Sequence, residues 1–251
     1  KVDVEFAQGK QMVDAAVANN VDHAVFMSIA DAERWPDECE HIPAKVKVES
    51  YLKESDIKRW SAVGPAAFFE NLDDPANWNP LTKGSLKFLM LESLKFSSAY
   101  DIGRAAVVQF KNPEEWKGKR MDVISYEGSL DDCANALEEV GGFPVKRGLA
   151  VPMFLRKLAL GKDLHCMCEF FAGRMGDGQG VRGTVEEFKK HVPDAHDAEA
   201  WFRHHGKYAN GEPIVGNGVP PSSGGFFVGV AAAAGVATVA VAVAIASARK
   251  R

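Results

Sequence analysis

The short stretch HIPAK places two side chains with useful chemistry four residues apart, His41 and Lys45. An imidazole with an ordinary pKa of about 6.5 can pass a proton near neutral pH. An ammonium brings three hydrogen-bond donors and a fixed charge, which suits sugar hydroxyls and lowers the pKa of a neighbouring group. Pro43 disfavours helical geometry at Ile42, so we expect His41 to precede the helix that carries Lys45. The alternative is the polar start of an ordinary amphipathic helix.

A second candidate follows the apolar run RWSAV, which predicts a strand that ends at Gly64 and Pro65. Ligands of open α/β sheets lie beyond the carboxyl ends of the strands. An aromatic ring there could pack on a flat ligand, and an amide could hydrogen-bond to it or fix the loop. The alternative is a hydrophobic loop tucked beneath a smaller lobe. The candidate side chains are Phe68, Phe69, Glu70 and Asn71.

A literal G-x-G-x-x-G occurs at Gly178, Gly180 and Gly183. Such a loop binds a pyrophosphate only when a strand leads into it and a helix N-terminus receives the phosphates. The preceding stretch CEFFAGRM predicts a helix and not a strand. We therefore expect a solvent-exposed connection here.

The four cysteines are too few and too scattered to predict a disulfide framework, so we expect reduced thiols in the cytosol or an organelle stroma. His165, Cys166 and Cys168 lie close together in the sequence. A C-x-C pair on a helix points its thiols about 200° apart, because each residue turns the helix by about 100°. We expect no metal site.

Composition excludes some classes of function. Apolar residues make up 46% of the 251 residues, enough for a sizeable core, and the formal net charge is −4. An acidic chain argues against direct nucleic-acid binding, which needs clustered Lys and Arg.

The elements that must position these side chains alternate between helix and strand over residues 1–208. This order predicts an α/β fold with a parallel sheet, right-handed crossovers and a smaller, mostly helical lobe. Helices are expected over residues 5–20, 43–55, 98–111, 129–142, 184–192 and 197–206, with strands over residues 22–29, 59–63, 119–126 and 144–151.

The C-terminal end has a different composition. Residues 209–225 are rich in Gly, Pro, Ser and Asn and predict a flexible linker. The 21 residues 226–246 carry no charge and would span about 30 Å as a helix, the thickness of a bilayer core. We expect a transmembrane tail anchor over residues 226–247, followed by a basic tail, 248–251. The alternatives are a buried Ala/Val helix or a pair of strands.

Four stretches in order, FAQGKQMVDAAVANNVDHAVFMS, HIPAKVKVESYL, VGPAAFFENL and YDIGRAAVVQF, resemble NmrA-like proteins. These are atypical short-chain dehydrogenases/reductases that include NAD(P)H redox sensors and transcriptional co-regulators. The resemblance covers about residues 4–205. It implies a Rossmann-like domain with NADP(H), in preference to NAD, bound in a cleft beside a small lobe.

The resemblance also assigns roles. It implies that Lys45 reaches the nicotinamide ribose, and that Phe68, Phe69, Glu70 and Asn71 lie beside the nicotinamide. Ser28, at the end of the first expected strand, joins this cofactor-binding set. His41 stands where many dehydrogenases of this type have a catalytic Tyr, so His41 and Lys45 are the candidate catalytic pair. The family's first strand and glycine-rich turn are expected upstream of Lys1, which would make this domain N-terminally incomplete.

Three functions fit these expectations. The first is a membrane-tethered NAD(P)(H)-binding redox sensor or regulator. The second is an NAD(P)H-dependent reductase or epimerase that acts on a small molecule. The third is a non-enzymatic scaffold that binds a protein partner through the small lobe.

Overall fold

The computed structural model describes residues 2–40, 42–72, 85–86, 93–147 and 153–204, with only the backbone of residues 2, 85–86 and 153–160. His41, the expected linker (209–225), the expected membrane anchor (226–247) and the basic tail (248–251) lie outside these residues. Within the described part, no helix is both long and apolar enough to cross a bilayer.

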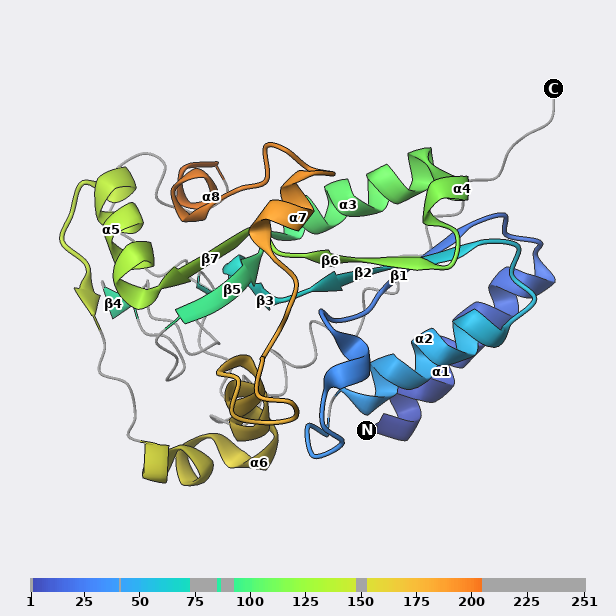
Figure 1. Ribbon diagram of the computed structural model, residues 1–251, viewed down its shortest axis with the longest axis horizontal. Helices are drawn as coiled ribbons and strands as arrows, with labels where there is room; N and C mark the ends of the chain where they lie inside the picture. The colour runs from blue at the N-terminus through green and yellow to red at the C-terminus, as the bar shows by residue number, and fades with distance from the viewer. Residues whose placement is uncertain (1, 41, 73–84, 87–92, 148–152, 205–251) are drawn as a thin grey trace, which may run out of the picture.

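A parallel sheet forms the centre of the larger lobe (Figure 1). Its strands lie in the order β1 (Ala24–Met27), β2 (Trp60–Pro65) and β6 (Lys119–Val123). Helices connect the successive strands, which is the arrangement that allows parallel pairing. The prediction of a Rossmann-like parallel α/β sheet is confirmed.

The side chains of each strand point alternately to the two faces of this sheet. Both faces are apolar, and helices cover both. In β1, Ala24 and Phe26 pack against the first two helices, whereas Val25 packs with Ile102 on the other side. One face is covered by α1 (Val2–Ala18) and α2 (Pro43–Glu54), and the other by α3 (Ala99–Lys111), α4 (Pro113–Trp116) and α7 (Val185–Lys189) (Figure 1).

The smaller lobe lies on the side of the carboxyl ends of these strands (Figure 1). Its helices are joined by two further small sheets, which the sequence did not predict. In the larger of these, β5 pairs antiparallel with β7 and parallel with β3. The strands are β3 (Ala67–Phe68), β4 (Ser85–Leu86), β5 (Ser93–Ser97), β7 (Tyr126–Ser129) and β8 (Lys146–Arg147), with helices α5 (Leu130–Gly141) and α8 (Ala198–His204).

At two points the chain runs almost directly from a strand of the large sheet into a strand of the smaller lobe. Ala66 alone separates β2 from β3, and only Ile124 and Ser125 separate β6 from β7. The buried hydroxyl of Ser97 accepts a hydrogen bond from the Ala66 amide and donates one to the carbonyl of Val123. This hydroxyl therefore joins the two sheets where neither has a ladder of its own.

Local signals placed several helix starts correctly. The helices expected from residues 129 and 184 begin there with capping boxes, Ser129 with Asp132 at α5 and Thr184 with Glu187 at α7. Ile42 differs from expectation, because it has helical angles (φ −83°, ψ −42°) although Pro43 follows it. Its carbonyl accepts the first hydrogen bond of α2, from the amide of Lys45, and this bond offsets the steric preference.

Candidate functional site

The carboxyl ends of β1 and β2 form the centre of the candidate site. The amide of Ser28 donates to the carbonyl of Val63, and the amide of Ala30 donates to that of Pro65, so the chain stays paired beyond β1. Ser28 is buried, and its hydroxyl donates to the carboxylate of Glu49 on α2. The predicted cofactor residue Ser28 thus links a strand end to α2.

Lys45 lies on the same face of α2 as Glu49, since residues four apart are neighbours on a helix. It is 6% exposed, and its ammonium lies 2.8 Å from the carboxylate of Glu5 on α1. The predicted catalytic pair of Lys45 and His41 cannot be placed in the structure, because His41 lies outside the described residues.

Phe68 and Phe69 have different environments. Phe68 is half-buried against the apolar cluster that contains Val63 and Ile102. Phe69 is 0% exposed and stacks between Phe96, with centroids 4.7 Å apart, and Trp201, with centroids 5.3 Å apart. The structure places Phe69 in the core of the small lobe, as the alternative interpretation of a tucked hydrophobic loop predicts.

Glu70 and Asn71 lie in a short 3₁₀ turn, η2 (Phe69–Leu72), where both are half-buried. One carboxylate oxygen of Glu70 accepts from the amide of Ala99, at 3.0 Å, and from the indole of Trp201, at 3.2 Å. Glu70 therefore joins this corner to the start of α3 and to α8.

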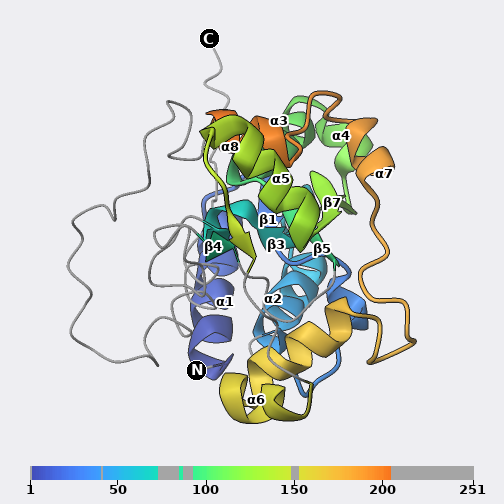
Figure 2. The same ribbon diagram turned by 90° about the vertical axis from the view of Figure 1, so that its left-hand side faces the viewer.

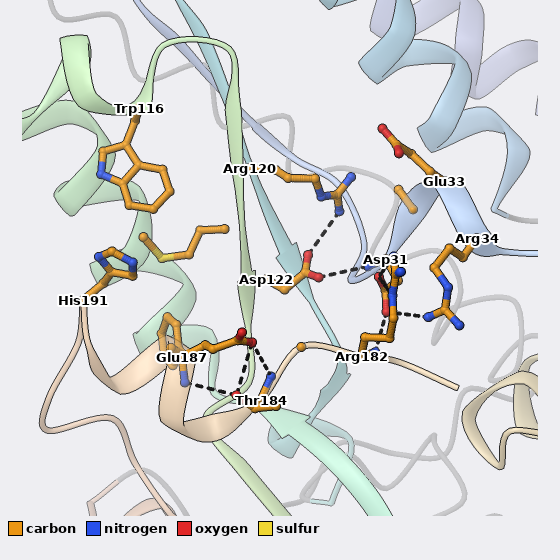
Figure 3. Close-up of a pocket in the computed structure, with 14 residues that line it drawn as sticks. Asp31, Glu33, Arg34, Trp116, Arg120, Asp122, Arg182, Thr184, Glu187 and His191 are labelled. Carbon is orange, nitrogen blue, oxygen red and sulfur yellow. Dashed lines mark hydrogen bonds and ion pairs between the residues drawn. The ribbon is translucent and has the colours of Figure 1, made fainter. Parts of the chain in front are cut away.

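A chain of charged groups leads from Glu49 across the sheet. Arg120 donates to Glu49 at 2.9 Å, to the carbonyl of Ile29 at 2.6 Å and to Asp122 at 3.2 Å. The second oxygen of Asp122 accepts from the amide of Asp31 at 3.3 Å (Figure 3). Burial raises the pKa of Asp122, and the positive charge of Arg120 opposes this shift. The network fixes the loop after β1.

Gly64 makes this network possible. A Cβ at this position would lie 2.6 Å from a carboxylate oxygen of Asp122 and 2.8 Å from both the Arg120 guanidinium and the Ile29 carbonyl. These distances are shorter than real contacts, so any side chain would displace the charged groups. The glycine that was expected only to end a strand is required for their approach.

A cavity of about 450 Å³ opens beside Asp122, and the sequence did not predict it. Asp31 lies at its rim in the left-handed region (φ 52°), and it accepts hydrogen bonds from Arg34 and from the backbone and side chain of Arg182 (Figure 3). The place of Asp31 in the sequence, shortly after the end of an expected strand, could have identified it as a candidate site residue. The other lining residues are Ala32, Glu33, Trp116, Arg120, Met121, Gly183, Thr184, Glu187, Phe188 and His191.

The expectation of reduced thiols is wrong for two of the four cysteines. Cys39 and Cys166 form a disulfide with Cα atoms 5.4 Å apart, across 127 residues of sequence. Cys133 and Cys168 are free thiols and are buried. Within the described residues, no group of three or more His, Cys, Asp and Glu side chains is placed to hold a metal ion.

The stretch Gly178–Gly183 connects two helices, α6 (Met153–Phe171) and α7. No strand leads into it, so it lacks the context of a phosphate-binding loop. It packs instead against the segment after β1, where Arg34 donates to the carbonyl of Gly180 at 2.5 Å and forms an ion pair with Asp177.

Comparison with known proteins gives the family. The model of the NmrA-like family matches residues 1–199. The chain belongs to the NmrA-like family. No match was found among the curated proteins.

Solved structures with this fold include regulators and enzymes. The negative transcriptional regulator NmrA in complex with NADP is 20% identical, with a TM-score of 0.56, over 85% of this chain and 72% of that one. The triphenylmethane reductase of Citrobacter sp. is 15% identical (TM-score 0.61; 82% and 72%). A nucleoside-diphosphate-sugar epimerase from Staphylococcus aureus is 20% identical (TM-score 0.58; 78% and 69%). At these identities, the similarities show the fold.

Proposed function

We propose that this chain belongs to an NAD(P)(H)-binding redox sensor or regulator and forms the wall around the nicotinamide end of the cofactor. One observation carries the proposal: Ser28 after β1, Lys45 on α2 and the corner after β2 come from three elements joined at the carboxyl ends of parallel strands. Ligands of this fold class occupy that position.

Lys45 is the proposed contact to the nicotinamide ribose. Its ammonium is already fixed by Glu5, so ribose hydroxyls would compete with that carboxylate for its donors. A buried cation held by a second helix is oriented before the ligand arrives, which lowers the ordering cost of binding. Phe68 and Asn71, which are half-buried, complete the proposed wall.

NADP(H) is favoured over NAD(H) in this proposal. Structures with the same fold were solved with NADP, in the regulator NmrA, and with NADP(H), in the triphenylmethane reductase, although NmrA was also solved with NAD. We therefore expect NADPH to bind more tightly than NADH.

The test is a calorimetric titration of the full chain with NADPH, NADP⁺ and NADH. We expect Lys45→Ala to weaken NADPH binding by about tenfold or more, the cost of losing one hydrogen bond to a charged group. Lys47→Ala, an exposed position on the same helix, should bind like the parent. Equal affinity of the Lys45 and Lys47 variants would refute the role of Lys45.

A reductase is the second candidate, favoured by the cavity beside Asp122, which is large enough for a small substrate. Sustained oxidation of NADPH with a quinone or dye acceptor would favour this candidate over a sensor. Cofactor binding without turnover would favour the sensor.

A membrane location is part of the proposal. Residues 226–247 would anchor the protein by its C-terminal end and leave the remaining domain in a reducing compartment, the cytosol or an organelle stroma. The chain truncated after residue 225 should leave the membrane fraction on flotation, whereas the full chain should stay in it. A truncated protein that still floats with membranes would contradict the anchor.

A further inference from the structure

The second half of α6 covers the carboxyl ends of all three strands of the large sheet. Ala30, Ala66 and Ile124 each lie just beyond the end of one strand, and all three are buried. They form one apolar cluster with Cys166 and Phe170 of α6. The helix thus closes the region where the proposed function places a ligand.

Trp35 connects this helix to the loop after β1. Its ring lies 4.2 Å from that of Phe170, measured between centroids, and its indole donates to the carbonyl of Ala30 at 2.8 Å. Any displacement of α6 therefore changes the environment of Trp35.

The disulfide adds a covalent link to this packing. Cys39 lies four residues before Pro43, the first residue of α2, and Cys166 lies in the second half of α6. The bond therefore ties the cover to the segment that enters the helix of Lys45. Figure 2 shows α6 beside the lower end of α2.

The remaining contacts of α6 and its following loop are non-covalent, and several are exposed. Lys162 lies 3.5 Å from Glu40, with both side chains more than half exposed. Asp177, the partner of Arg34, is 47% exposed, and Arg182, a partner of Asp31, is 58% exposed. The Lys162–Glu40 pair is exposed and contributes little. The partners Arg34 and Asp31 are only 12% and 8% exposed, but their pairs hold the loop after α6 and not the helix itself. The apolar cluster and the disulfide therefore hold the cover.

We propose that Cys39 and Cys166 form a reversible redox lock on α6. A dithiol reductant transfers two electrons and two protons to the disulfide; the S–S bond breaks, two thiols form, and the reductant becomes a disulfide. In the reduced protein α6 opens from the strand ends more often. This lock rests on the proposed function only in its second consequence, which is weaker NADP(H) binding in the reduced state, because the ligand must then order the cover.

The other two cysteines do not provide this lock. Cys133 is buried in the small lobe, and burial raises the pKa of its thiol to about 12, so it is not a nucleophile at neutral pH. Cys168 follows Cys166 by two residues on the same helix, and side chains two apart point about 200° apart, so Cys168 does not face Cys39 as Cys166 does. Cys133→Ser is therefore a matched control.

The first test measures α6 in the full chain, equilibrated with either oxidised or reduced dithiothreitol. We expect hydrogen exchange over residues 162–171 to be at least about fivefold faster in the reduced protein, with a change in Trp35 fluorescence that is absent in Trp35→Phe. Cys39→Ser should exchange at the fast rate under both conditions, and Cys133→Ser should respond like the parent. Equal exchange of the parent in both states, or a parent that forms no disulfide under oxidising conditions, would overturn the lock.

The second test measures NADPH affinity in the same two states. We expect affinity at least about fivefold weaker after reduction, the lower end of ordinary coupling between sites. Redox-dependent exchange without NADPH binding in either state would support the lock and refute the proposed cofactor. NADPH binding with equal exchange in both states would support the proposed cofactor and refute the lock. Redox-dependent exchange with equal affinity would overturn the coupling.

Discussion

The ammonium of Lys45 and the carboxylate of Glu5 lie 2.8 Å apart and join α2 to α1, with side chains only 8% and 20% exposed. Removal of one partner from a shielded pair leaves a charge without compensation. We expect Glu5→Ala to lower the free energy of unfolding by about 1–2 kcal/mol, less than for a fully buried pair because water still reaches Glu5. Urea denaturation measures this change.

Glu199→Ala is the control for that measurement. Glu199 pairs with Arg203 at 2.6 Å on α8, but both side chains are nearly half exposed. Its removal should cost no more than about 0.5 kcal/mol. If both substitutions cost the same, the Lys45–Glu5 pair contributes no more than a surface pair.

Gly64→Ala should destabilise the protein by about 1–3 kcal/mol, because the new methyl group displaces Asp122, Arg120 or the Ile29 carbonyl. Gly103→Ala on α3 is the same substitution with the opposite expected effect on stability. A Cβ at Gly103 meets no atom within 4 Å, so the better helix former should stabilise by about 0.5–1 kcal/mol. Thermal melts of both variants check the prediction, and two changes of the same sign would contradict it.

His23 makes stability depend on pH. Its ring is buried, which disfavours the protonated form. Burial therefore lowers the pKa of His23, and the positive charge of Arg59 lowers it further. Ser61 gives its only proton to Gln109, so the His23 Nε2 must donate to Ser61. The neutral ring is the form that fits the folded state.

The sign of this dependence follows from the lowered pKa. Above the unfolded pKa of about 6.5, His23 is neutral in both states and costs nothing. As the pH falls below that value, the unfolded state binds a proton that the folded state refuses, so stability falls. His23→Gln should reduce this slope in urea denaturation between pH 7 and pH 5, whereas the exposed His191→Gln should retain it. A parent protein with a flat profile would refute the role of His23.

Phe69 distinguishes a core role from a ligand-binding role. Because its ring is fully buried between Phe96 and Trp201, Phe69→Ala should cost about 3–5 kcal/mol of stability. Tyr100→Ala, at a side chain 54% exposed, should cost less than about 1 kcal/mol. If Phe69→Ala kept its stability and lost only NADPH binding, Phe69 would be a cofactor contact and not a core residue.

The sequence predicted the elements whose signals are local. The helices α1, α2, α3 and α5 follow from apolar periodicity and caps, and β1, β2 and β6 from short buried runs bounded by turns. These signals lie within one turn or one strand, so they survive in the folded protein.

The small lobe was not predictable in the same way. The pairing of Phe96 with Tyr126, and of Ser93 with Ser129, joins segments about thirty residues apart. The run SLKFS alternates polar and apolar residues as a strand does, but nothing within these five residues indicates which segment they pair with. The disulfide between Cys39 and Cys166 is more distant still, since nothing near either cysteine indicates its partner.

Part of the candidate site was likewise predictable from the sequence and part was not. Ser28 and Lys45 were identified by resemblance to a family, and the structure describes their surroundings. The network from Glu49 through Arg120 to Asp122 was missed, because Glu49 lies on α2 and the other two on β6, and they meet only after the sheet forms. Asp31 could have been found from its place beyond a strand end.

The hydroxyl of Ser97 has a consequence for how the molecule comes apart. Through the Ala66 amide and the Val123 carbonyl, it forms a side-chain bridge between the backbones of the two sheets at their junction. The chain runs from β2 into β3 after one residue and from β6 into β7 after two, so the two sheets meet at two points of the backbone. We therefore expect the two lobes to melt in one cooperative transition, as a single foldon and not as two independent units.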